Sequence, residues 1–224
     1  MKNKYVKRSK ISEAKFRKII MYFALELDSQ KIATLTSLNR NTVSRYLTRI
    51  RCRIVELCEY QARTASCGPM AKTVRQAAAH ANWSLPDTLN SMPVFGIQSR
   101  NAHIYTEILE NGIHRKLRQL IKNDASSDRL TLPTDCLHYD GIVDLNSRLH
   151  YRLNAVSTEN GGNGDPTDHI EEFLGFARKR LTTINLNGAD YFSLLLKECE
   201  YRFNNRGDNV YQLLLKRFRE RPIS

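Results

Sequence analysis

Three acidic residues in the second half of the sequence have the types and spacing of a metal-dependent phosphodiester site. Asp135 closes the strand-like run "RLTLPTD", and open α/β sheets bind their ligands at strand ends. Asp168 and Glu171 are three residues apart at the start of a helix-like segment, so they share a face. Carboxylate oxygens are the hard ligands that Mg²⁺ prefers. The three residues are therefore candidate metal ligands and catalytic residues.

Two basic residues follow the acids on the same predicted helix. Arg178 lies seven positions after Glu171 and Lys179 lies eleven after Asp168, which are nearly whole numbers of helical turns. Cations at these positions suit phosphate binding at a metal-assisted site. A simpler interpretation stays open, because acids at a helix N-terminus often only complement the helix dipole. In that interpretation the "RKR" segment is a solvated face.

The elements that must position these residues predict a layered α/β domain. Apolar or alternating runs predict strands at 92–98, 102–109, 129–135 and 149–156, of which the first two form a hairpin. A helix is predicted at 112–123. Two closing helices have an apolar face at i, i+3, i+4 and i+7 spacing and should pack on the sheet. The first face is Ile170, Phe173, Leu174, Ala177 and Leu181, and the second is Phe192, Leu195, Leu196, Cys199 and Phe203.

The first sixty residues predict three helices, with Ser12 as the N-cap of the first and Ser29 as the N-cap of the second. The short connection "SLNRN" between the second and third helices predicts a helix-turn-helix. The apolar residues of the first helix are Phe16, Ile19, Ile20, Phe23, Ala24 and Leu27. Those of the second are Ile32, Ala33 and Leu35, and those of the third (41–57) are Val43, Tyr46, Leu47, Ile50 and Ile54.

The outward residues of the third predicted helix and its turn are basic or hydrogen-bonding. Such side chains suit base edges and phosphates, so they are candidate DNA-binding residues. They are Arg40, Asn41, Ser44, Arg45, Thr48 and Arg49. The alternative is a small helical bundle whose third helix is merely solvated.

Bulk composition favours a nucleic-acid partner. The formal net charge of the 224 residues is +12, and a basic surface releases counterions when it binds a polyanion. The apolar stretches are too short for a membrane span, and no signal peptide is apparent, so we expect a cytoplasmic protein with no membrane partner. Five scattered cysteines without a C-x-x-C pair argue against zinc and against a disulfide framework.

Most of the chain resembles a bacterial insertion-sequence transposase family. The segments "PVFGI…AHIYTEI…TDCLHYDGIVDL…HYRLN…HIEEFLGFARKRL…YFSLLLKECEYRFNNR" are similar to its DDE-type catalytic domain, which has a ribonuclease H-like fold. The segment "KIATLTSLNRNTVSRYLTRIR" is similar to its DNA-binding region. The resemblance covers about 10–58 and 92–217. It implies two Mg²⁺ or Mn²⁺ ions for cleavage and strand transfer, and a homo-oligomer on the terminal inverted repeats of double-stranded DNA.

The resemblance assigns Asp135 to the second catalytic aspartate, Asp168 to the third catalytic position and Glu171 to an adjacent family glutamate. Arg178 or Lys179 takes the basic role that follows. One departure is large: the strand that should carry the first aspartate, of type Gly-Glu-x-Glu-x-Asp-Glu-Ser, is not found before "PVFGI". Two are smaller: an aspartate replaces the usual asparagine at the third position, and "LHYDG" is shortened.

The sequence therefore predicts an α/β protein with three parts. A helix-turn-helix domain (1–58) precedes an irregular segment (59–91) and an incomplete ribonuclease H-like mixed sheet flanked by helices (92–224). Our hypothesis for the missing strand is a frameshift across about 64–91, which the other two reading frames of the gene would test. Two functions follow: a transposase, inactivated if the first aspartate is lost, or a non-catalytic DNA-binding remnant or repressor.

Overall fold

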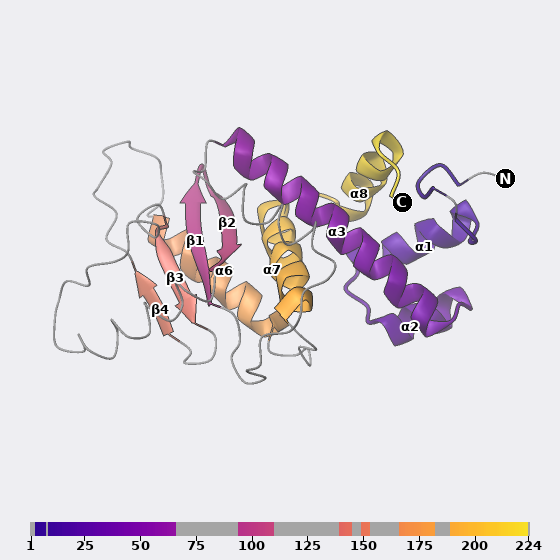
Figure 1. Cartoon of the computed structure of the whole chain (residues 1–224), viewed down its shortest axis with the longest axis horizontal. Helices are drawn as coiled ribbons and strands as arrows, with labels where there is room; N and C mark the ends of the chain where they lie inside the picture. Colours follow the sequence, from indigo (N-terminus) through magenta and orange to yellow (C-terminus); the bar gives the residue numbers. More distant parts are fainter. Residues whose placement is uncertain are drawn as a thin grey trace. The chain divides into compact units, whose positions relative to one another are not determined.

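The computed structural model describes 3–7, 9–65, 94–109, 139–144, 149–152, 166–181 and 189–223 (Figure 1). The chain divides into two compact units. Unit 1 combines Met1–Leu57 with Asn204–Ser224, and unit 2 is Cys58–Phe203. The described elements are helices and an antiparallel sheet, which confirms the α/β class. The predicted three-part organisation at 1–58, 59–91 and 92–224 stays a prediction.

In unit 1, α1 (Glu13–Ala24) begins where the sequence predicts. The Ser12 hydroxyl accepts a hydrogen bond from the Lys15 backbone N–H at 3.3 Å, so Ser12 is the N-cap. The apolar stripe is buried because four residues at helical spacing face the interior: Phe16, Ile19, Ile20 and Phe23. Ala24 and Leu27, which the prediction also placed on the stripe, are only partly buried.

Two predictions for α2 (Ser29–Thr36) are wrong. Its N-cap is Asp28, whose carboxylate accepts from the Lys31 backbone N–H at 2.8 Å, and Ser29 is the first helical residue. Leu35, expected in the core, is 52% exposed, whereas Ile32 and Ala33 are buried as predicted. A helix of two turns has room for only a narrow apolar stripe, and Leu35 falls beside it.

The third helix, α3 (Arg40–Thr64), is longer than the prediction, which ended it at 57. Its predicted inward residues are all buried: Val43, Tyr46, Leu47, Ile50 and Ile54. The helix continues because Cys58 and Ala62, one turn apart, are buried in unit 2. Glu59 and Arg63 also form an i, i+4 ion pair along it.

A helix that the sequence analysis missed completes unit 1. The helix α8 (Val210–Glu220) is capped by Asn209 and packs on α1, with Leu214, Leu215 and Phe218 buried. Its Phe218 ring lies 6.1 Å from the Phe16 ring. Only two closing helices were expected, because the apolar repeat was followed no further than Phe203.

Unit 2 contains a four-stranded sheet in the order β2-β1-β3-β4. Its strands are β1 (Val94–Arg100), β2 (His103–Ile108), β3 (Gly141–Asp144) and β4 (Leu149–Arg152), and the three pairings are antiparallel. The β1–β2 hairpin confirms the predicted one. Its two-residue turn, Asn101 and Ala102, has φ of 51° and 60°, as type I′ turns require. A ribonuclease H-like mixed sheet stays a prediction.

Two helices cover one face of this sheet, α6 (Pro166–Leu181) and α7 (Ala189–Asn204) (Figure 1). Both predicted apolar faces are buried in one core with Phe95, Ile97, Ile104 and Val143 of the sheet. The Phe95 and Phe192 rings are 6.3 Å apart, which ties α7 to β1. The predicted helix 112–123, the predicted strand 129–135 and most of 59–91 lie outside the described residues.

Candidate nucleic-acid interface

The turn between α2 and α3 is three residues long and is held by its own hydrogen bonds. Ser37 takes the left-handed conformation with φ of 51°, and its backbone N–H donates to the Thr34 carbonyl. The Asn39 side chain accepts from the Asn41 backbone N–H at 2.8 Å and so caps the start of α3. This turn fixes the direction in which α3 leaves α2.

The candidate DNA-binding residues lie on the outer side of the first turns of α3. Arg40, Asn41, Arg45 and Thr48 are exposed, and Ser44 and Arg49 are half-buried. Arg40 and Arg45 form no ion pair with any described residue, so their charge is not neutralised by a neighbour. The Arg49 guanidinium lies over the Tyr46 ring at 5.8 Å, which orients it along the helix.

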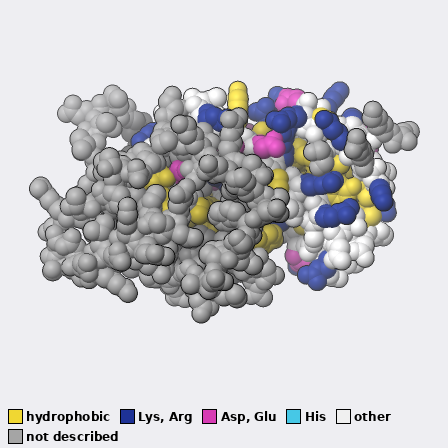
Figure 2. All heavy atoms as spheres, in the orientation of Figure 1, with side chains coloured by type: hydrophobic (Ala, Val, Ile, Leu, Met, Phe, Trp, Pro, Cys, Tyr) yellow, Lys and Arg dark blue, Asp and Glu magenta, His cyan; other side chains and the backbone are white. Residues whose placement is uncertain are grey.

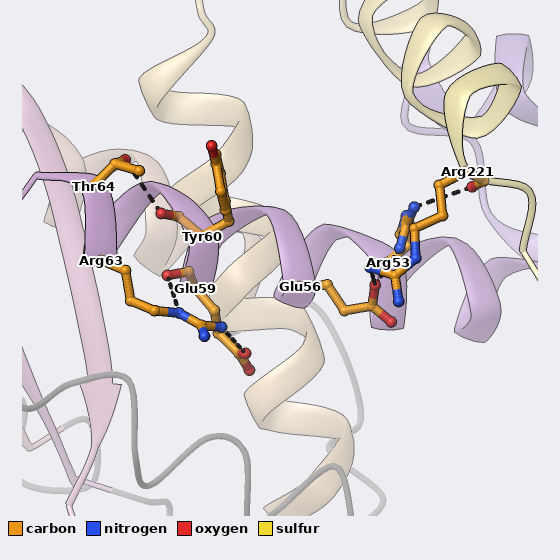
Figure 3. Close-up of polar contacts among 7 residues, drawn as sticks. All are labelled: Arg53, Glu56, Glu59, Tyr60, Arg63, Thr64 and Arg221. Atoms are coloured by element: carbon orange, nitrogen blue, oxygen red, sulfur yellow. Dashed lines mark hydrogen bonds and ion pairs between the residues drawn. The ribbon is translucent and has the colours of Figure 1, made fainter.

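The acidic residues of α3 lie only in its second half, where they hold other cations (Figure 3). Glu56 pairs with Arg53 and, at 3.5 Å, with Arg221, and Arg53 also donates to the Arg221 carbonyl. Arg53 is buried, so it is a structural residue of unit 1. The first sixteen residues of α3 contain no Asp or Glu, so this half of the helix is uniformly basic.

The net charge of the chain is confined to unit 1. The residues of unit 1 include nineteen Lys and Arg against six Asp and Glu, a net charge of +13. Unit 2 contains the remaining sixteen Lys and Arg against seventeen Asp and Glu, a net charge of −1. In Figure 2 the dark blue Lys and Arg side chains gather where Figure 1 draws α1 and α3. The positive charge that would attract a polyanion therefore lies in unit 1 and not in unit 2.

The predicted catalytic residues are only partly visible. Asp135 lies outside the described residues, and Asp168 falls in the first turn of α6 without a described side chain. Glu171, Arg178 and Lys179 are exposed on α6. Within the described part of the chain no group of three His, Cys, Asp or Glu side chains comes together as a metal site. Of the three expected carboxylates, the one with a described side chain is that of Glu171.

A buried charged network in unit 2 was not predicted. The Lys197 ammonium donates to the Glu200 carboxylate at 2.7 Å and to the Thr106 carbonyl. The same Glu200 oxygen accepts from the Thr106 backbone N–H at 2.9 Å and from its hydroxyl at 2.7 Å. The Cys58 thiol donates to the Lys197 carbonyl at 3.6 Å. These contacts join α3, α7 and β2 inside unit 2. The sequence signal that could have predicted this network is a lysine and a glutamate three residues apart within the apolar run "LLLKECE".

This network fixes the ionisation of its members. Burial, reinforced by the Glu200 carboxylate, raises the pKa of the Cys58 thiol well above its ordinary value of 9.0. Burial is the largest effect on Lys197 and lowers its pKa, but Glu200, Cys58 and Glu107 together outweigh it, and the pKa is raised from its ordinary value of 10.5. Cys58 is therefore a neutral thiol and Lys197 a cation at physiological pH. Neither is exposed to a ligand.

No helix in the described part of the chain is long and apolar enough to cross a bilayer. No family model and no solved structure matches the chain. The sequence is 30% identical over 102 residues to an "Uncharacterized transposase-like protein" of Haemophilus influenzae. The match spans 46% of this chain and 81% of that protein. On this relationship, the chain belongs to the family of transposase-like proteins.

Proposed function

We propose that the protein is an insertion-sequence transposase that binds the terminal inverted repeats of its element through unit 1. The observation that carries the proposal is the charge partition, a net +13 on the helical unit against −1 on the sheet unit. Phosphate neutralisation provides essentially all of the non-specific affinity of a protein for duplex DNA and a large share of its specific affinity. Membership of the transposase-like family favours DNA over other polyanions.

In this proposal α2, its three-residue turn and α3 act as a helix-turn-helix, and the start of α3 reads the major groove. Arginine makes bidentate hydrogen bonds to guanine and asparagine makes them to adenine. Arg40, Asn41 and Arg45 are exposed at that end of α3. Ser44 and Thr48 complete the same side, although the Thr48 hydroxyl already donates to the Ser44 carbonyl at 3.1 Å.

The test is binding of Arg45→Ala to a duplex carrying an element end. We expect a loss of about 1–3 kcal/mol, or roughly 5- to 150-fold in Kd, measured by fluorescence anisotropy at one fixed salt concentration. The matched control is Arg63→Ala, on the same helix in unit 2, where the arginine already pairs with Glu59. Equal affinities for Arg45→Ala, Arg63→Ala and the wild type would contradict the recognition role of α3.

The catalytic half of the proposal is metal-dependent cleavage and strand transfer by Asp135, Asp168 and Glu171. What supports it is the transposase-like family and the exposure of Glu171 on α6, with Arg178 and Lys179 further along the helix. Carboxylates of this kind would hold Mg²⁺ or Mn²⁺, which supplies activation of the attacking oxygen. We propose a homo-oligomer on DNA as the active form.

A nicking assay with Mn²⁺ and DNA that carries an element end distinguishes an active transposase from a non-catalytic DNA-binding protein. The assay compares the wild type with Asp135→Asn. Nicking by the wild type that the variant has lost supports the transposase. Binding without nicking by either protein supports the non-catalytic remnant or repressor. The affinity of both proteins for DNA is measured in parallel, because a folded Asp135→Asn protein should bind as the wild type does.

A further inference from the structure

The N-terminal segment 3–11 of unit 1, called the arm here, lies against the end of the chain. Val6 and Ile223 form a parallel β-bridge. The Lys7 backbone N–H donates to the Ile223 carbonyl at 2.8 Å, and the Ile223 N–H donates to the Tyr5 carbonyl at 3.0 Å. The arm is therefore fixed beside the segment that follows α8, and both Tyr5 and Val6 are buried.

The other end of the arm lies against α3. The Ser9 and Tyr46 hydroxyls are 3.1 Å apart, within hydrogen-bonding distance. The Tyr46 ring is the one over which Arg49 lies. Backbone and side-chain contacts thus carry the arm from the end of α8 to the side of the proposed recognition helix.

Four exposed cations on the arm and on α8 are left out of the ion pairs of these two segments, since Glu220, which follows Arg219, pairs with Arg217. They are Lys7, Lys10, Lys216 and Arg219, and they define the arm–α8 surface. None of them forms an ion pair with a residue that the structure describes. Lys216 and Arg219 are three apart, so they share one side of α8.

Two other described cations of the same segments, Lys4 and Arg217, are already paired. Lys4 pairs with Glu13 at 3.0 Å, and Arg217 pairs with Glu220 at 3.3 Å. The arm–α8 surface therefore has a charge excess that unit 1 does not neutralise internally, and its paired neighbours provide matched controls.

We propose that the arm–α8 surface binds DNA phosphates beside the segment that α3 reads. This inference rests on the proposed function and extends it, because it makes the two ends of the chain one binding element with α3. Lysine binds phosphate as a point charge and carries no base specificity. The surface therefore adds affinity and salt dependence, equally for any DNA sequence.

The test compares the salt dependence of DNA binding by full-length variants. Each phosphate contact contributes about 0.9 to the slope of log Kobs against log salt concentration. For Lys216→Gln/Arg219→Gln, and separately for Lys7→Gln/Lys10→Gln, we expect the slope to fall by about 1.8 on both a random duplex and one carrying an element end. The ratio of the two affinities should stay as in the wild type, and circular dichroism should show unchanged folding.

The control is Lys4→Gln/Arg217→Gln, which removes two paired cations from the same segments. Its slope should fall by less than half as much as in either test variant. An unchanged slope in both test variants, with normal wild-type binding, overturns this inference and leaves the proposed function standing. Wild-type protein that shows no salt-dependent DNA binding overturns the proposed function itself. A slope change with an acidic protein but not with DNA would assign the surface to a protein partner and so overturn the inference.

Discussion

Replacing Glu200 by Gln removes one negative charge from the interior of unit 2 with little change of shape. The wild-type carboxylate is 1% exposed and the Lys197 side chain is 6% exposed. One Glu200 oxygen accepts from the ammonium and twice from Thr106. Glutamine can place an oxygen at the same position, so the variant chiefly tests the charge.

The expected loss follows from the protonation of Lys197. In the wild type the attraction of Glu200, with smaller contributions from Cys58 and Glu107, overcomes burial and raises the Lys197 pKa above 10.5. Without Glu200, the effect of burial on the Lys197 ammonium is no longer offset. Loss of the Lys197 proton is then the response that costs the least free energy. Deprotonating a lysine of pKa 10.5 at pH 7 costs about 5 kcal/mol at 1.36 kcal/mol per unit, which sets the upper limit. Breaking a buried ion pair typically costs about 3–5 kcal/mol.

The stability difference between Glu200→Gln and the wild type should depend on pH. In Glu200→Gln the folded-state pKa of Lys197 lies below the unfolded value, so the folded state binds fewer protons and stability rises with pH towards 10.5. In the wild type the pKa is raised, so the contribution of Lys197 is complete below 10.5 and is lost only above it. The two proteins should therefore converge in stability as the pH rises.

The assay is urea unfolding followed by circular dichroism at several pH values. The double variant Glu200→Gln/Lys197→Met removes both charges and should recover most of the loss, because it leaves no unpaired charge in the interior, and the Gln oxygen can still accept from Thr106. Glu172→Gln, an exposed glutamate of α6 in the same unit, is the control and should change stability by less than about 1 kcal/mol. If Glu200→Gln unfolds like the wild type, or the double variant is no more stable than the single one, the charge argument fails.

Three further predictions concern stability. Asp28→Ala removes the N-cap of α2 and should cost about 1 kcal/mol, measured by thermal unfolding, with the exposed Lys18→Ala as the control. In the reduced wild type the free energy of unfolding should fall as the pH rises above 9.0, because the Cys58 thiol ionises there only in the unfolded state. The expected slope is up to about 1.4 kcal/mol per pH unit, and Cys58→Ala should lack it. Phe218→Ala should cost about 3–5 kcal/mol by urea unfolding because it empties the contact between α8 and α1, and a cost below 1 kcal/mol would show that α8 is dispensable to unit 1.

The local pattern of the sequence was enough to predict which face of each long helix is buried. The inward residues of α3, α6 and α7 recur at i, i+3 and i+4, and this repeat depends only on neighbours within two turns. The β1–β2 hairpin is local in the same sense. For the candidate site, the sequence predicted the kinds of residue involved but not their geometry. The predicted outward residues of α3 do lie on its outer side. The carboxylate centre of Asp135, Asp168 and Glu171 stays a prediction.

Contacts between distant segments were beyond the reach of the sequence pattern. The bridge between Val6 and Ile223 joins the two ends of the chain, and the Glu200 carboxylate meets Thr106 across 94 positions. Such pairs leave no periodic signal, because each depends on where the intervening chain returns in space. The sequence determined that the protein is basic and that most of the excess lies in residues 1–57, whereas the fold added the basic C-terminal segment to the same unit, because Asn204–Ser224 returns to the N-terminal helices.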